Sequence, residues 1–218
     1  MLKNQALSEY KSWNHEISLK KETMSEKLSI YQLLSEKLQE LQDYLNSNLW
    51  REYIQHFTSK TEYPVIFVPK KDEKQQLCID YQRLNTIIRK NRYSLSLIKK
   101  LQEQLKEAKW FTKLDIQKEY YKVHIKKEEE WKTVFQMRYE LYKYQIMSFE
   151  LTNTSATFQG LINHVLYDHL NKFVITYLND ILIYFKNEEN HEKHIKKILR
   201  KLQKKKLYLK LKKYEFHK

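Results

Sequence analysis

The segment from Phe173 to Phe185, FVITYLNDILIYF, most constrains what this chain can fold into. Two runs of β-branched and aromatic residues flank the polar pair Asn179-Asp180, which is typical of a β-hairpin with a two-residue turn. In such a hairpin we expect Asp180 to lie at the turn, clear of the sheet. Because Asn and Asp both tolerate a positive φ, the segment taken alone indicates an ordinary turn.

A second acidic residue ends an apolar run upstream. The run from Trp110 to Leu114 has the composition of a strand and is followed by Asp115. Asp115 and Asp180 are therefore both expected at strand ends. Divalent cations such as Mg²⁺ prefer carboxylate oxygens, so the two residues are candidate metal ligands if folding brings the strands together.

The remaining pattern predicts a mixed α and β protein. Residues 1–32 are polar and irregular, whereas leucines recur at helical spacing from Leu34 to Leu49. Further elements are expected as strands at 65–68, 77–79 and 208–211, a strand pair within 131–147, and helices at 97–108, 154–170 and 188–205.

The charge balance favours a polyanionic partner. Forty-one basic against 27 acidic residues leave a net charge of +14, and 17 Tyr with nine Phe provide aromatic surface for stacking on bases. Nucleic acid is the favoured partner. The alternative is a compositional bias toward Lys, Asn, Ile and Tyr, which AT-rich coding produces without any selection for binding. Composition alone leaves both interpretations open.

Several protein classes are disfavoured by the sequence. The single Cys78 excludes an internal disulfide, and an intracellular protein of the cytoplasm or nucleus is expected. Neither a membrane span nor an export signal is indicated, because the apolar stretches are short and the N-terminus lacks a hydrophobic core. His191 and His194 could bind a metal, but a solvated helix face is favoured.

Seven blocks in the same order resemble the reverse transcriptase of gypsy-type long-terminal-repeat retrotransposons. The blocks are YPVIFVPKKD (63–72), LCIDYQRLN (77–85), KNRYSLSLI (90–98), WFTKLDIQKEYYKVHI (110–125), EWKTVFQMRYE (130–140), IMSFELTNTSATFQ (146–159) and YLNDILIY (177–184). The resemblance covers nearly the whole chain. It implies an RNA-directed DNA polymerase domain of a retrotransposon polyprotein, in a degenerate and truncated copy.

The resemblance implies an α+β fold, the fingers and palm of a right-hand polymerase. The palm would hold an antiparallel sheet backed by helices, and the thumb would be absent. Residues 1–32 would form an N-terminal polar segment, residues 33–108 mostly fingers, and residues 109–218 mostly palm, ending before the primer grip and thumb. A chain of 218 residues is long enough for one or two such lobes.

The resemblance also implies a catalytic set, Asp115, Asn179 and Asp180. In the family three aspartates hold two Mg²⁺ ions, which support nucleotidyl transfer from deoxynucleoside triphosphates to a primer on an RNA or DNA template. Asp115 and Asp180 match metal-binding aspartates, but Asn179 stands where the family has the first Asp of its YxDD motif. A neutral amide removes one of three negative charges, so metal affinity and turnover are expected to fall together.

Four nucleotide-binding residues are implied by the same resemblance. Lys70 matches a lysine that grips the triphosphate, whereas Gln76 replaces an arginine and loses a bidentate phosphate clamp. Tyr120 matches the aromatic residue that rejects a ribose 2′ hydroxyl, and Phe149 keeps its family identity. Glu119, beside Tyr120, replaces a small residue and is expected to face the triphosphate with like charge. Glu150, beside Phe149, replaces a glycine that allows close backbone approach.

Many departures from the family pattern are reachable by a C-to-T or G-to-A base change, which suggests a copy decayed by one mutational process. Three interpretations therefore stay open. The chain is a reverse transcriptase domain, an inactive relic that only binds nucleic acid, or an unfolded pseudogene product. Impaired catalysis is favoured because Asn179 and Gln76 both remove charge from the site.

Overall fold

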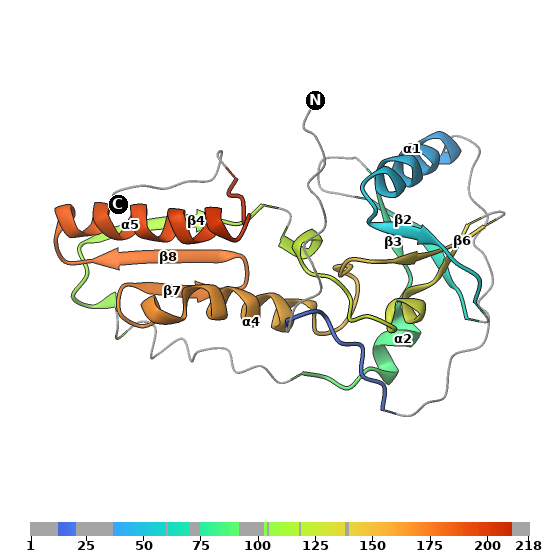
Figure 1. The fold of residues 1–218 in the computed structure, drawn as a ribbon, viewed down its shortest axis with the longest axis horizontal. Helices are drawn as coiled ribbons and strands as arrows, with labels where there is room; N and C mark the ends of the chain where they lie inside the picture. The colour runs from blue at the N-terminus through green and yellow to red at the C-terminus, as the bar shows by residue number, and fades with distance from the viewer. Residues whose placement is uncertain are drawn as a thin grey trace. The chain divides into compact units, whose positions relative to one another are not determined.

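The chain forms two compact units that interleave along the sequence (Figure 1). Unit 1 comprises residues 1–90 and 120–154, and unit 2 comprises residues 91–119 and 155–218. The computed structural model describes residues 13–20, 37–59, 61–69, 75–91, 103, 105–117, 119–137 and 140–210. Within this described part, no helix is both long enough and apolar enough to cross a membrane.

Unit 1 contains a mixed five-stranded sheet with the order β1-β6-β5-β2-β3. The strands are β1 (Ile54–His56), β2 (Tyr63–Pro69), β3 (Gln75–Ile79), β5 (Phe135–Gln136) and β6 (Leu141–Tyr144). β2 runs parallel to β5, and the other neighbours pair antiparallel. The strands predicted at 65–68 and 77–79 are confirmed as β2 and β3, and the pair predicted within 131–147 as β5 and β6.

The core of unit 1 is rich in aromatic side chains. Tyr63 and Tyr81 are almost fully buried and meet edge to face, with ring centroids 5.2 Å apart. The Tyr81 hydroxyl donates a hydrogen bond of 2.7 Å to the Thr133 carbonyl, which satisfies its polar end inside the core. Phe135 of β5 is also fully buried. These rings explain how a chain with few alanines fills its interior.

Unit 1 also contains two helices and two 3₁₀ turns. They are α1 (Lys37–Trp50), α2 (Gln82–Ile87), η1 (Glu119–Lys122) and η2 (Glu130–Thr133). The turn η1 begins one residue before the second segment of the unit. The helix predicted from the leucine spacing is confirmed as α1 over its described residues. Leu41 is buried and Leu45 and Leu49 pack against the core, as the helical period predicts.

Residues 13–20 pack into unit 1 although their sequence looks polar. Ile17 is fully buried, and its backbone N–H donates to Glu129 Oε2 at 2.6 Å. His15 forms a parallel bridge with Ile125, and Leu19 an antiparallel bridge with Ile88. Burial lowers the pKa of His15 to about 4, so its imidazole is neutral at physiological pH. A few apolar residues without a regular period, in a polar stretch, are too weak a signal to predict this packing.

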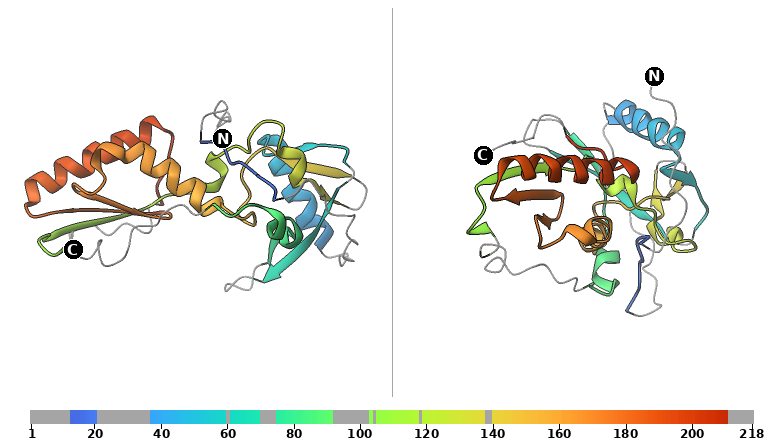
Figure 2. Two further views of the ribbon diagram at one scale, coloured as in Figure 1. Left: turned by 90° about the horizontal axis from the view of Figure 1, so that it is seen from below. Right: turned by 60° about the vertical axis from the view of Figure 1, so that its left-hand side comes forward.

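Unit 2 is a three-stranded antiparallel sheet with helices on one face. The strand order is β4-β8-β7, with β4 (Trp110–Asp115), β7 (Val174–Tyr177) and β8 (Asp180–Phe185). Both long helices, α4 (Thr154–Leu166) and α5 (Glu188–Lys204), lie on the same side of this sheet (Figure 2, left). The predicted strand through Leu114 and both predicted helices are confirmed, although α4 ends four residues early and continues as the 3₁₀ turn η3 (Tyr167–His169).

The expectation of a solvated face for His191 and His194 is wrong. His191 is fully buried, and its Nε2 lies 2.9 Å from Thr112 Oγ1 of β4. The His194 ring stacks on Phe173, with centroids 3.7 Å apart. The lysines of α5 conceal an apolar stripe that faces the sheet, and the histidines belong to that stripe.

Two further predictions differ from the structure or fall outside it. The short strand predicted at 208–211 is reduced, over the described residues, to an isolated bridge between Leu209 and Ile116. The helix predicted at 97–108 lies largely outside the described residues, and Ala108 at its expected end is not helical.

Candidate active site

The hairpin between β7 and β8 turns at Leu178-Asn179, not at Asn179-Asp180. Tyr177 pairs with Asp180, so Asp180 is the first residue of β8 and part of the sheet. The prediction that Asp180 lies in the turn is therefore wrong by one residue. Ile181 and Ile183 explain the shift, because both are fully buried and a one-residue slip would turn them to the other face of the sheet.

Asp115 and Asp180 lie directly opposite each other on neighbouring strands. Asp115 is the last residue of β4 and Asp180 the first of β8, and the two are register partners. Residues opposite each other in an antiparallel pair point to the same face, with Cβ atoms about 5 Å apart. Folding thus brings together two carboxylates that are 65 positions apart in the sequence.

The two carboxylates lie on the sheet face away from the helices. Thr112 bonds to His191 of α5, so it points toward the helices. Successive side chains of a strand point to opposite faces of the sheet. Leu114 therefore lies on the helix side with Thr112, and Lys113 and Asp115 lie on the other side. Asp115 is 7 % exposed, and Asp180 is half-buried.

Each carboxylate is paired with a lysine. Lys210 Nζ lies 2.9 Å from Asp115 Oδ1, and Lys113 Nζ lies 2.9 Å from Asp180 Oδ2. The backbone N–H of Lys210 also donates to the Asp115 carbonyl at 2.9 Å, which fixes this segment beside the strand end. The two ammonium groups balance the two negative charges of the acid pair.

This arrangement does not fit a two-cation centre. Within the described ranges, no group of three or more His, Cys, Asp or Glu residues is placed to hold a metal ion. Asp115 and Asp180 provide two carboxylates, and the neighbouring turn residue Asn179 is a neutral amide. Hard divalent cations favour several anionic oxygens, so two carboxylates already balanced by lysines form a weak site.

A buried glutamine of α4 supports the turn, and sequence reasoning missed it. Gln159 is 2 % exposed, and its Oε1 accepts a hydrogen bond of 2.6 Å from the backbone N–H of Leu178. Its Nε2 donates to Thr176 Oγ1 and to Asn163 Oδ1, each at 2.9 Å. Leu178 has a φ of 52°, which is unfavourable for a leucine, so this network holds a strained turn. The available signal was a pair of amides, Gln159 and Asn163, at i,i+4 in an otherwise apolar helix.

Replacing Gln159 with alanine is expected to destabilise the chain by about 1 to 3 kcal/mol, because buried polar groups of the network lose their partner. Urea unfolding measures the change. Gln39→Ala is the matched control, since Gln39 is also helical and bonds an i+4 oxygen, at Asp43, but is exposed. Its expected change is within about 0.5 kcal/mol. Equal losses in the two variants would show that the network does not stabilise the turn.

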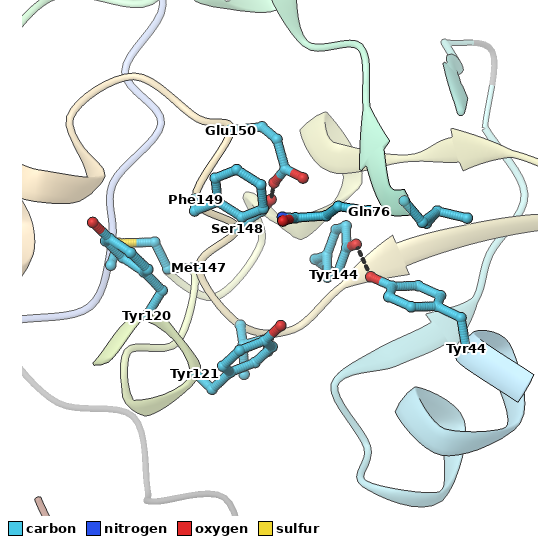
Figure 3. Close-up of a pocket in the computed structure, with 11 residues that line it drawn as sticks. Tyr44, Gln76, Tyr120, Tyr121, Tyr144, Met147, Ser148, Phe149 and Glu150 are labelled. Atoms are coloured by element: carbon cyan, nitrogen blue, oxygen red, sulfur yellow. Dashed lines mark hydrogen bonds between the residues drawn. The ribbon is translucent and has the colours of Figure 1, made fainter. Parts of the chain in front are cut away.

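Unit 1 contains a pocket of about 330 Å³ with aromatic walls (Figure 3). Gln76, Tyr120 and Phe149, three of the four predicted nucleotide-binding residues, line it together. The fourth, Lys70, lies outside the described residues. Of the described residues that line the pocket, Glu150 alone carries a charged side chain.

Glu150 is held in an unfavourable environment for a charge. Burial raises its pKa to about 7, although the backbone N–H groups of Glu150 and Ile79 and the side chain of Cys78 donate to the carboxylate. The Ser148 hydroxyl also donates to it. At neutral pH this carboxyl therefore binds a proton for a large part of the time.

Two tyrosines that line this pocket are joined by a hydrogen bond. The hydroxyls of Tyr44 and Tyr144 lie 2.5 Å apart and share a hydrogen bond (Figure 3). Burial raises the pKa of both phenols well above the usual value near 10, so both rings stay neutral. The part of the wall that they form is aromatic and uncharged at physiological pH.

Comparison with known proteins identifies the class. The family described as reverse transcriptase (RNA-dependent DNA polymerase) matches residues 68–218. The match spans more than half of the chain, and it includes both Asp115 and Asp180. The chain belongs to the reverse transcriptase family. Members of this family generally use Mg²⁺.

Similar sequences occur in transposon polyproteins of a fission yeast. The Transposon Tf2-3 and Tf2-7 polyproteins of Schizosaccharomyces pombe are each 32% identical to this chain over 207 residues. These matches cover 95% of the chain but only 16% of each polyprotein. The chain thus spans about a sixth of the length of these relatives.

Solved structures share the fold. The foamy viral protease-reverse transcriptase in complex with RNA/DNA hybrid has a TM-score of 0.79 and 17% identity, covering 92% of this chain and 27% of that one. The foamy viral protease-reverse transcriptase dRH in complex with ds DNA has a TM-score of 0.80 and 18% identity, covering 94% and 36%. The chain therefore has a reverse transcriptase-like fold with sheets and helices.

Proposed function

We propose that this chain is the reverse transcriptase domain of a gypsy-type retrotransposon polyprotein, in a degenerate copy with impaired catalysis. An intact domain of this kind extends a primer on an RNA or DNA template with deoxynucleoside triphosphates, using two Mg²⁺ ions. The observation that carries the proposal is the cross-strand pair of Asp115 and Asp180 with Asn179 at the adjoining turn. Two acids of the family's catalytic set lie together, and the third position has lost its charge.

Unit 1 corresponds in this proposal to the fingers and unit 2 to the palm. The pocket lined by Gln76, Tyr120 and Phe149 belongs to unit 1, and the acid pair belongs to unit 2. The antiparallel sheet of unit 2 with helices on one face supports the assignment as palm. This assignment places residues 120–154 in the fingers, whereas the sequence-based division into 33–108 and 109–218 placed them in the palm.

The pocket supports impaired nucleotide binding as well. Gln76 is neutral where the family has an arginine, and an amide cannot replace a charged bidentate clamp on phosphate. Glu150 lines the same pocket and repels an anion whenever it is ionised. Both changes lower the affinity expected for a triphosphate, independently of the weak metal site.

A second candidate function is binding of nucleic acid without catalysis. The net charge of +14 favours it, and structural neighbours of the same fold are seen with RNA/DNA hybrid or double-stranded DNA. A fold can keep a basic surface for the phosphate backbone after its catalytic residues are lost.

The chain is expected to bind a primed template with strong salt dependence and to extend primers only at a trace rate. A surface making about six phosphate contacts loses about a thousandfold in affinity between 50 and 200 mM salt. Fluorescence anisotropy with a labelled RNA/DNA hybrid measures the binding, and the same sample with Mg²⁺ and deoxynucleotides tests extension. Salt-independent binding would contradict the nucleic-acid role. A far-ultraviolet circular dichroism spectrum without helix or strand signal would instead indicate the third interpretation, an unfolded product.

A further inference from the structure

We propose that the aromatic pocket of unit 1 binds an organic cation, a quaternary alkylammonium group, in preference to a phosphate group. The proposal goes beyond the polymerase function, because it requires neither a metal ion, nor a template, nor any residue of unit 2. It rests on the walls of the pocket, on the one charged side chain among the described residues that line it, and on the way its rings are held in place.

The walls provide aromatic faces from separate elements. Tyr44 comes from α1, Tyr121 from η1 and Tyr144 from β6, while Phe149 follows β6 along the chain. The negative faces of aromatic rings attract cations, and a cage of several rings is the usual way in which proteins recognise quaternary ammonium groups. Figure 3 shows these rings around the same space, with Glu150 at its edge.

Contacts with one another and with Tyr53 hold the rings in position. The hydrogen bond between the Tyr44 and Tyr144 hydroxyls joins two of them across elements. Tyr121 stacks on Tyr53, with ring centroids 5.1 Å apart and planes within 23°. A cage that is already ordered loses less conformational entropy when a ligand enters, so even a small cation can bind measurably.

The charge of the pocket selects a cation. Glu150 is the only charged side chain among the described residues that line it, although the whole chain carries +14. The carboxylate is disfavoured by burial, and a cation placed beside it supplies the opposite charge that the site lacks. An anion would meet both the carboxylate and the negative ring faces.

The affinity for a cation should rise with pH through about 7, where burial places the pKa of Glu150. Among the described residues, the titratable groups that interact with Glu150 are Tyr44, Tyr81, Tyr121, Tyr144 and Cys78. Burial raises the pKa of all four of these phenols, so they carry no charge near pH 7. Ionised Glu150 attracts the ligand and protonated Glu150 does not, hence binding strengthens from pH 6 to pH 8.

Isothermal titration calorimetry tests the proposal. The full chain is titrated with choline at pH 8, and the heat of binding gives the affinity. The uncharged isostere 3,3-dimethylbutan-1-ol has the same shape and is expected to bind at least about tenfold more weakly, since it lacks the cation–π attraction. Glu150→Gln should weaken choline binding about tenfold, while the control Glu40→Gln, at an exposed position of α1, should leave it unchanged.

Three results would overturn the proposal. They are equal binding of choline and its isostere, unchanged choline binding by a folded Glu150→Gln variant, and no detectable choline binding at pH 8. Phe149→Leu provides a second variant that keeps the charge and removes a ring, and it should weaken choline binding without changing the pH dependence. None of these results depends on whether the chain extends primers.

Discussion

Replacing Asn179 with aspartate is expected to raise primer extension at limiting Mg²⁺ at least about thirtyfold. The new carboxylate adds one negative charge at the turn beside Asp115 and Asp180. A unit charge 4 Å from a divalent ion contributes about 2 kcal/mol even at the dielectric constant of water, which is about a thirtyfold gain in binding. Extension should rise in parallel because the reaction needs the bound metal.

Two variants isolate the charge effect of Asn179→Asp. Asn179→Ala changes the same turn residue without adding charge, and it should give no gain. Asp115→Asn in the Asn179→Asp background removes one carboxylate again, and it should return extension to the level of the unmodified chain. Single-nucleotide incorporation on a labelled primer measures all four proteins. Equal rates for the aspartate and alanine variants, both folded, would show that the missing charge does not limit activity.

Replacing Glu150 with glutamine is expected to stabilise unit 1 by about 3 kcal/mol at pH 8. The folded-state pKa of Glu150 is raised to about 7 from an ordinary value of 4.5, so the folded chain binds this proton more tightly than the unfolded chain does. The contribution of the Glu150 carboxyl to the free energy of unfolding is therefore largest at low pH, where the carboxyl is protonated in both states. This contribution is lost as the pH rises from about 4.5 to about 7. Glutamine cannot ionise and removes that loss.

The pH dependence distinguishes this effect from a change in packing. The gain from Glu150→Gln should shrink to less than about 1 kcal/mol at pH 5, where the folded-state carboxyl of the unmodified chain is already protonated. Urea unfolding at the two pH values measures the difference. Glu40→Gln, at an exposed position, should stabilise the chain at neither pH. A gain from Glu150→Gln that is equal at pH 5 and pH 8 would rule out ionisation of Glu150 as its cause.

The sequence predicted the strands that bring the acid pair together, because their β-branched runs leave little alternative. β4 and β8 were both expected, and so were Asp115 and Asp180 near their ends. The exact turn was not predictable from the Asn179-Asp180 pair. Burial of Ile181 and Ile183 against the helices sets the register, and that depends on tertiary packing.

Other features depend on contacts between distant segments and leave little trace in the sequence. Lys210 reaches Asp115 across 95 positions, and the Leu178 turn is held by Gln159 of a helix. The pocket joins Tyr44 with Phe149 and Glu150, which no local pattern connects. The interleaving of the two units is likewise a product of topology, because each unit is built from two separate segments of the chain.

The central claim is that Asp115 and Asp180, beside the neutral Asn179, form only a weak metal site. A metal titration followed at individual residues tests this claim most directly. Mn²⁺ is added to the ¹⁵N-labelled chain, and paramagnetic broadening of the Asp115 and Asp180 amide signals is followed by nuclear magnetic resonance. We predict weak, millimolar binding at this pair, because two lysine-balanced carboxylates replace the three acids of an intact site. Micromolar binding at Asp115 and Asp180 in the unmodified chain would contradict the account.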